Sequence, residues 1–187
     1  IVVRLVGSEM CIRDSSRTIF KTCWQNLVSN LRIGQGFDAH KIIKGSKDFI
    51  LGGIAIDSEY EVVAHSDGDI ISHAIIDALL GACKMGDIGK LAPSNEENKG
   101  ISSIHLLKKV ATMLLEAGYQ IVNIDLTYVG EEPRLEKFKK KIEENLAKEL
   151  KMNPNDISCK ATTTDGLGYE GTREGVSSHA IALVTKT

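Results

Sequence analysis

A change of hydrophobic period between two adjoining segments is the feature that most constrains the fold of this chain. Across residues 103–117 the apolar side chains recur at the three- and four-residue spacing of an amphipathic helix. Gly118 follows, and glycine is the residue that most often ends a helix. Across residues 120–130 apolar and polar side chains alternate, which is the period of a half-buried strand. A helix followed directly by a strand predicts helices packed on a β-sheet.

The two patterns also predict which side chains face the core. The helix should turn inward Ile104, Leu107, Ala111, Leu114 and Leu115. The strand should turn inward Val122, Ile124, Leu126 and Tyr128.

Further elements follow from the same reasoning. Helices are predicted over residues 70–82, with Asp69 as N-cap, and over residues 135–150, where Pro133 suits a helix start. The other predicted elements are strands over residues 31–37 (ending in a Gly-rich turn), 49–56 (bent at Gly52-Gly53), 156–163 and 176–184, and a loop over 86–98. The order β-β-α-α-β-α-β-β predicts an α/β fold of the α+β sandwich type, with one mixed β-sheet and three helices on one face.

Composition excludes several classes of protein. Of the 187 residues, 42% are hydrophobic and 26% are charged, which suits a packed core and is too balanced for a disordered chain. A net charge of −2 argues against a nucleic-acid-binding protein, which usually carries an excess of positive charge. No apolar run approaches the ~18 residues that span a membrane. The four cysteines form no CxxC pair, which argues against a zinc ribbon and favours a reducing compartment.

The first thirty residues look foreign to the rest. They contain no sustained period, they hold the only Trp, and the chain does not begin with Met. Three origins are open: a targeting segment, a linker from an upstream fused domain, or a scar of cloning or sequence assembly. Residues 3–15 resemble translated adapter sequence, which favours the scar, while residues 18–30 remain compatible with a linker. The predicted organisation is a poorly ordered tail over residues 1–30 and one domain over residues 31–187.

Three residues have the composition of an open metal site. Asp38 and His40 stand two residues apart at a predicted strand end, so both side chains can leave the same side of the backbone. His73 lies in the helix predicted over residues 70–82, and two histidines with one carboxylate leave a vacancy on a metal ion. Asp77, one helical turn after His73, would orient its ring. The alternative is a set of unrelated polar residues at element ends.

Two further segments carry groups that suit phosphate. Residues 65–69 precede a helix N-terminus, where free N–H groups favour anions and His65 could donate, although two aspartates argue against an anion unless they act as caps. Residues 161–165 offer three threonine hydroxyls and one carboxylate, which suit phosphate and a divalent cation. The alternative is a β-rich threonine run. Arg134 would contact phosphate or remain solvated. The GxGxxG match at residues 166–171 is rejected as a dinucleotide-binding motif. No helix is predicted after it, and the 16 residues that remain are too few for the βαβ unit that such a motif requires.

Taken together, the motifs resemble the 2-C-methyl-D-erythritol 2,4-cyclodiphosphate synthase family of the non-mevalonate isoprenoid pathway. The resemblance covers about residues 31–186 and rests on several motifs in the order that the family has. These are RIGQGFDAH (32–40), AHSDGD (64–69) with His73, DALLGA (77–82), GDIGK (86–90), EPR (132–134) and KATTTD (160–165).

The resemblance implies a lyase that converts 4-diphosphocytidyl-2-C-methyl-D-erythritol 2-phosphate into the 2,4-cyclodiphosphate and CMP. It implies a homotrimer with active sites between subunits. Asp38, His40 and His73 would bind Zn²⁺ (or Mn²⁺), and Asp165 would bind Mg²⁺ (or Mn²⁺) at the diphosphate. His65 and Thr163 would be catalytic and would stabilise the transition state.

The resemblance also implies a substrate pocket, whose cytidine-binding part comes from the neighbouring subunit through residues 130–136 and 161–163. The residues expected to bind substrate are Asp38, His40, His65, Ser66, Asp87, Ile88, Gly89, Gly130, Pro133, Arg134, Leu135, Ala161, Thr162, Thr163, Thr164, Asp165 and Tyr169.

The chain departs from the family pattern at several positions. Residues 92–96 read APSNE where FPDTD is common, Asp165 stands where Glu is usual, and Arg134 replaces a usual Lys. The divergent loop resembles members fused behind a cytidylyltransferase, so a lost fusion partner is one expectation. The expected compartment is a bacterial cytoplasm, with a plastid-type organelle as the alternative. Two rival functions are a metal-dependent phosphohydrolase and a non-enzymatic trimeric metal-binding module.

Overall fold

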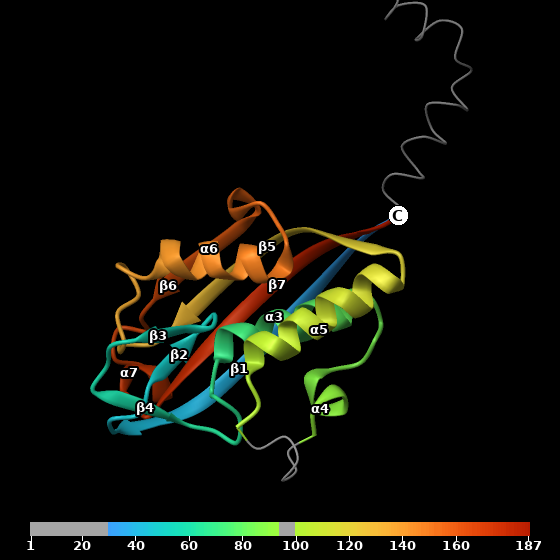
Figure 1. Cartoon of the computed structure of the whole chain (residues 1–187). Helices are drawn as coiled ribbons and strands as arrows, with labels where there is room; N and C mark the ends of the chain where they lie inside the picture. The colour runs from blue at the N-terminus through green and yellow to red at the C-terminus, as the bar shows by residue number, and fades with distance from the viewer. Residues whose placement is uncertain (1–29, 94–99) are drawn as a thin grey trace, which may run out of the picture. The chain divides into compact units, whose positions relative to one another are not determined.

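The computed structural model describes residues 30–93 and 100–187. Its main feature is a five-stranded sheet in the order β4-β1-β7-β5-β6 (Figure 1). These strands are β1 (Leu31–Lys44), β4 (Tyr60–Val63), β5 (Tyr119–Val129), β6 (Ile157–Thr162) and β7 (Gly175–Lys186). Strand β5 runs parallel to β6 and antiparallel to β7, and β1 runs antiparallel to β4. The prediction of a mixed sheet is confirmed.

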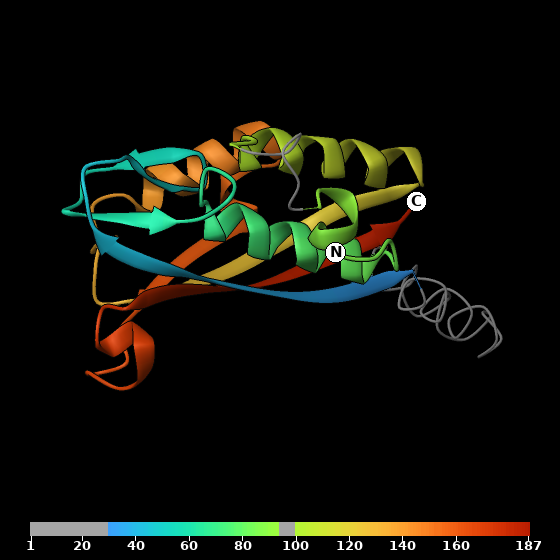
Figure 2. The same ribbon diagram turned by 90° about the horizontal axis from the view of Figure 1, so that it is seen from below.

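Three long helices cover one face of this sheet: α3 (Ile70–Ala82), α5 (Ser103–Glu116) and α6 (Lys139–Leu150) (Figure 2). The core lies between the two layers, where Ile75, Leu107 and Ile142 have no exposed surface. Three short elements lie in the connections: α4 (Ile88–Leu91), η2 (Pro154–Asp156) and α7 (Gly168–Gly171). None of the helices that the structure describes combines the length and the apolar composition needed to cross a membrane.

The segment predicted as one bent strand is a separate hairpin. Strands β2 (Phe49–Leu51) and β3 (Ile54–Ile56) pair with each other as a two-stranded sheet. Gly52 and Gly53 form the turn with φ values of 55° and 73°. Two successive residues in the left-handed region make the tight turn that joins antiparallel strands, so the glycine pair reverses the chain rather than bending it.

Strand β1 is longer than predicted, and this places Asp38 and His40 inside the strand rather than at its end. The glycines that indicated a turn serve packing instead. A Cβ atom on Gly34 would lie 1.9 Å from the Ala78 carbonyl oxygen, and one on Gly36 would lie 1.9 Å from that of Ala74. Helix α3 can therefore lie directly on β1 only because both side chains are absent.

Some of the side chains that were predicted to face the core are buried and others are exposed. In α5 the buried apolar residues are Leu106, Leu107, Val110 and Leu114, whereas Leu115, predicted to face the core, is 71% exposed. In β5 the side chains of Ile124, Leu126 and Tyr128 are buried as predicted. Val122 is 38% exposed, because the register with β7 shifts between Ile121 and Asn123 and a bulge interrupts the alternation.

The last helix starts later than predicted. Helix α6 begins at Lys139, so Pro133 does not stand at a helix start and residues 136–138 form a turn. The apolar stripe predicted for this segment nevertheless packs on the core, with Leu135, Ile142, Leu146 and Leu150 buried. A short helix, α4, interrupts the loop predicted over residues 86–98. The predictions for residues 1–29 and for the divergent positions 94–96 lie outside the described residues.

Candidate active site

The close approach of β1 and α3 creates the candidate site. Side chains alternate along β1, so Asp38 and His40 lie on the same side as Gly34 and Gly36, which is the side that α3 covers. His73 stands in the first turn of α3, one residue before Ala74, the residue whose carbonyl packs on Gly36. The two glycines thus bring the histidine of the helix beside the two polar residues of the strand.

The three side chains converge on one point. Asp38 Oδ2 lies 3.0 Å from His40 Nε2 and 2.8 Å from His73 Nδ1, and the two nitrogen atoms are 3.4 Å apart. A tetrahedral ion with ligands at about 2.0–2.2 Å holds neighbouring ligand atoms roughly 3.3 Å apart. The predicted convergence is therefore confirmed, and the donor set fits one divalent ion. Within residues 30–93 and 100–187 this is the group of His, Cys, Asp and Glu that could hold a metal.

Hydrogen bonds and ion pairs join the three side chains. Burial alone would raise the pKa of Asp38, but hydrogen bonds with His40 and His73 lower it to about 2. Burial alone would lower the pKa of His73, but the hydrogen bond with Asp38 and the nearby carboxylates raise it. The carboxylate is therefore ionised at neutral pH, as a metal ligand must be.

The far nitrogen of His73 contacts two hydroxyls. His73 Nε2 lies 2.8 Å from Ser103 Oγ and 3.4 Å from Ser66 Oγ. The prediction that Asp77 orients the His73 ring is wrong, because both ring nitrogens have other partners. The Asp77 carboxylate instead accepts a 2.7 Å hydrogen bond from the Ile88 N–H. Asp77 thereby anchors the start of α4, where Asp87 accepts from Lys90 N–H as the N-cap. A contact between residues 30 positions apart could not be inferred from local spacing, so Ser103 was missed.

The two aspartates of the segment 65–69 act as caps, which is the alternative that the sequence left open. Asp69 is fully buried and accepts from the N–H groups of Gly52 (2.8 Å), Gly53 (2.7 Å) and Ser72 (3.1 Å), and from the Ser72 hydroxyl (2.6 Å). It therefore joins the β2–β3 turn to the start of α3, as its predicted N-cap role requires. Asp67 accepts from Ser103 N–H at 2.9 Å.

The other predicted residues lie at the ends of β5 and β6. Gly130 N–H donates to the Thr162 carbonyl at 3.1 Å, and the Tyr128 hydroxyl donates to the Glu132 carbonyl at 2.7 Å. These bonds connect the segment containing Pro133, Arg134 and Leu135 to the end of β6. Ala161, Thr162, Thr163 and Asp165 are exposed there, with Thr164 partly covered. Within the motif GxGxxG the structure has only the one-turn helix α7, and β7 follows.

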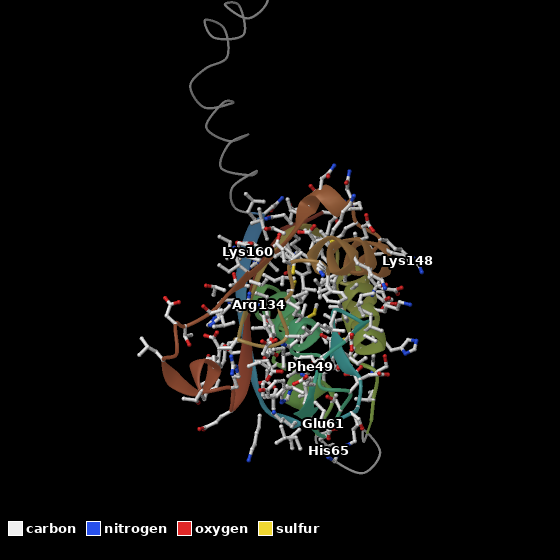
Figure 3. The ribbon with its side chains drawn as sticks, turned by 90° about the vertical axis from the view of Figure 1, so that its left-hand side faces the viewer. Phe49, Glu61, His65, Arg134, Lys148 and Lys160 are labelled. Carbon is white, nitrogen blue, oxygen red and sulfur yellow. The ribbon has the colours of Figure 1, made fainter. Side chains whose placement is uncertain are left out.

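The two groups of predicted residues do not meet within one chain. Strands β7 and β5 lie between β1 and β6, and neighbouring strands are about 4.8 Å apart, so the two groups are separated by roughly 14 Å of sheet. Figure 3 shows Arg134 well away from His65, whose side chain is exposed. Tyr169 is the exception, because it lines a cavity of about 430 Å³ together with His40.

The fold and the candidate metal site define the class: an α+β domain with two histidines and one carboxylate converging between a strand and a helix. The chain belongs to the YgbB family, whose profile matches residues 31–185. It is 43% identical over 155 residues to the 2-C-methyl-D-erythritol 2,4-cyclodiphosphate synthase of Syntrophomonas wolfei, covering 82% of this chain and 98% of that protein. It is 45% identical over 157 residues to the enzyme of the same name from Clostridium novyi, covering 83% and 99%.

Solved structures give the same assignment. The fold is similar to IspF of Plasmodium falciparum in complex with CDP, with a TM-score of 0.75 and 33% identity, covering 84% of this chain and 97% of that one. It is also similar to the bifunctional IspDF of Campylobacter jejuni, with a TM-score of 0.81 and 34% identity. There the match covers 84% of this chain but only 42% of the bifunctional chain.

Proposed function

We propose that this chain converts 4-diphosphocytidyl-2-C-methyl-D-erythritol 2-phosphate into 2-C-methyl-D-erythritol 2,4-cyclodiphosphate and CMP. The observation that carries the proposal is the convergence of Asp38, His40 and His73 in a chain 43–45% identical to enzymes of that name. The relatives named above that carry this name come from bacteria, and the proposed compartment is a bacterial cytoplasm.

The reaction needs no nucleophile from the protein, because the substrate supplies its own. An oxygen of the 2-phosphate bonds to the β-phosphorus, the bond from that phosphorus to the oxygen of CMP breaks, and CMP leaves with the electron pair. The chain must hold two anionic groups in line. Such orientation lowers a barrier by several kcal/mol, up to roughly 7–11 kcal/mol.

The donor set suits Zn²⁺ or Mn²⁺ at Asp38, His40 and His73, and Asp165 would hold Mg²⁺ or Mn²⁺ at the diphosphate. When bound, such ions polarise phosphoryl oxygens and offset their charge. His65, which is exposed beside the start of α3, would donate a hydrogen bond to a phosphate oxygen, and the Thr163 hydroxyl would do the same. The Asp87–Gly89 segment, held by Asp77, would contact the substrate.

A homotrimer with shared sites would bring the separated residues together. The face of the sheet opposite the helices carries exposed apolar side chains: Ile33 is 72% exposed, Phe37 46% and Ile181 50%. Phe37 also contacts the ring of His179 on the neighbouring strand, with ring centroids 4.8 Å apart and the planes tilted by 49°. Apolar surface on an otherwise uncovered sheet supports burial against further copies of the chain. Residues 130–136 and 161–163 of one copy would then form the cytidine pocket beside the metal site of another.

Mass spectrometry of the products tests the function. The purified chain is incubated with the cytidine diphosphate substrate, Mg²⁺ and Zn²⁺. The proposal predicts the cyclic diphosphate and CMP in equal amounts. His40→Ala should form neither product, while its circular dichroism spectrum should match that of the unmodified chain. The matched control is His105→Ala, which changes an exposed histidine on α5 and should stay active. Release of inorganic phosphate would identify a phosphohydrolase instead, and intact metal binding without turnover would identify a binding module.

A further inference from the structure

The orientation of His73 depends on residues that come from two other segments of the chain. Ser103, the first residue of α5, is fully buried, and its hydroxyl oxygen lies 2.8 Å from His73 Nε2. The same hydroxyl donates a hydrogen bond to Asp67 Oδ1. A strand, two helices and the 65–69 segment therefore meet at one imidazole ring.

The direction of each hydrogen bond follows from counting protons. A serine hydroxyl has one proton, and Ser103 gives it to Asp67, which as a carboxylate can only accept. The Ser103 oxygen can then interact with His73 only by accepting, so Nε2 must carry a proton. The proton on Nδ1, which faces the Asp38 carboxylate, is the one that a bound metal would replace. Ser66 Oγ lies 3.4 Å from the same nitrogen and accepts from Gly68 N–H at 3.2 Å, so it has a second lone pair that can face Nε2–H.

Asp67 is itself held in place. Its carboxylate accepts from Ser103 N–H at 2.9 Å and from Asp69 N–H at 3.3 Å, in addition to the Ser103 hydroxyl. Two backbone donors and one side-chain donor fix its position, so the carboxylate keeps the Ser103 hydroxyl turned away from His73. This is the relation between a ligand histidine and its supporting carboxylate that stabilises metal sites, here with a serine inserted between them.

We propose that Ser103 and Asp67 are positioning residues that hold His73 in the Nε2–H tautomer and present the lone pair of Nδ1 to the metal. The inference rests on the metal centre of the proposed function, but it does not depend on the substrate or the reaction. A hydroxyl that served only the start of α5 would have no effect on metal affinity.

Competition for Zn²⁺ between the protein and a chromophoric chelator tests the inference in the absence of any substrate. Ser103→Ala should weaken zinc binding about 10–100-fold, the usual effect of losing such a supporting contact. Ser102→Ala is the matched control, because the adjacent Ser102 makes no side-chain capping hydrogen bond and its loss should leave the Kd within twofold. Ser103→Thr, which keeps the hydroxyl, should bind zinc more tightly than Ser103→Ala.

Asp67→Asn provides a second variant in case Ser103→Ala does not fold. It keeps the shape of the side chain but lets the amide donate, so the Ser103 hydroxyl is no longer fixed and zinc binding should again weaken. Folded variants that bind zinc as tightly as the unmodified protein would overturn the inference. Because zinc binding is the readout, a chain that failed to make the cyclic diphosphate would not affect the result.

Discussion

At the scale of single residues, Asp38 is the point on which both histidines converge. Its Oδ2 atom lies within 3.0 Å of each, and only a quarter of its side-chain surface is exposed. The three side chains form ion pairs with one another, and the same geometry would coordinate a metal in place of the protons. Proton and metal therefore compete for the same ligand atoms.

This competition predicts the pH dependence of stability in the metal-free protein. The pKa of Asp38 is lowered to about 2 when folded, so its contribution is present above its ordinary pKa of about 3.9 and is lost as pH falls through 2. The pKa of His73 is raised when folded, so its contribution is complete below about pH 6.5 and is lost as pH rises through the raised value. The lowered pKa of Asp38 and the raised pKa of His73 both arise from the same interaction between these two side chains, so their contributions to stability are not summed.

Urea denaturation of the metal-free chain and of Asp38→Asn, from pH 4 to pH 9, measures the effect. The unmodified chain should be more stable by on the order of 2 kcal/mol near pH 5, and its advantage should shrink above pH 6.5. An advantage that is constant across this range, or that grows with pH, would contradict the ion pair.

At the scale of elements, the packing of α3 on β1 decides whether the site exists. Gly36 lies where a Cβ atom would be 1.9 Å from a backbone carbonyl of α3, so no side-chain movement can make room. Gly36→Ala should cost about 2–3 kcal/mol and should also weaken zinc binding, since the strand and helix must move apart. Gly81→Ala is the matched control on α3 itself. A Cβ there meets nothing within 4 Å, so alanine should be neutral or stabilising by up to ~1 kcal/mol.

Denaturation and zinc titration of the two variants measure this difference. Equal stability of Gly36→Ala and Gly81→Ala would show that the close approach of strand and helix is not required.

The end of β5 gives a second prediction at this scale. The buried Tyr128 hydroxyl holds the Glu132 carbonyl, and with it the segment proposed to bind cytidine. Tyr128→Phe keeps the packing and removes one hydrogen bond, worth about 0.5–1.5 kcal/mol. Isothermal titration with CMP should therefore show binding weakened by roughly two- to tenfold. Tyr119→Phe, at the other end of β5, should bind CMP normally, and an unchanged Kd in Tyr128→Phe would contradict the role.

What could be predicted from the sequence differs between local and tertiary features. Asp69 was identified as a cap, and the alternation through Asp38 and His40 was sufficient to place them on one side, because both depend on neighbours in the chain. The full length of β1 could not be predicted, because the sequence does not distinguish glycines that pack against a helix, such as Gly34 and Gly36, from glycines that form a turn. The support of His73 by Ser103 rather than Asp77 depends on how α5 folds back over α3, which no local spacing encodes.

At the scale of the whole molecule, one active site of the proposed enzyme needs two copies of the chain. The metal centre belongs to β1 and α3, while the segments proposed to bind cytidine lie at the ends of β5 and β6, on the other side of β7. Two inactive variants damaged in different halves should therefore complement each other. In a mixed trimer, some interfaces combine the intact metal centre of one subunit with the intact cytidine segment of its neighbour.

The most direct test mixes His40→Ala and Thr163→Ala subunits by refolding them together and measures the cyclic diphosphate formed. Each variant alone should be almost inactive. An equimolar mixture should recover about a quarter of the unmodified activity, because random assembly makes one interface in four intact. A mixture no more active than its two components would show that each chain carries a complete site, and would contradict the account.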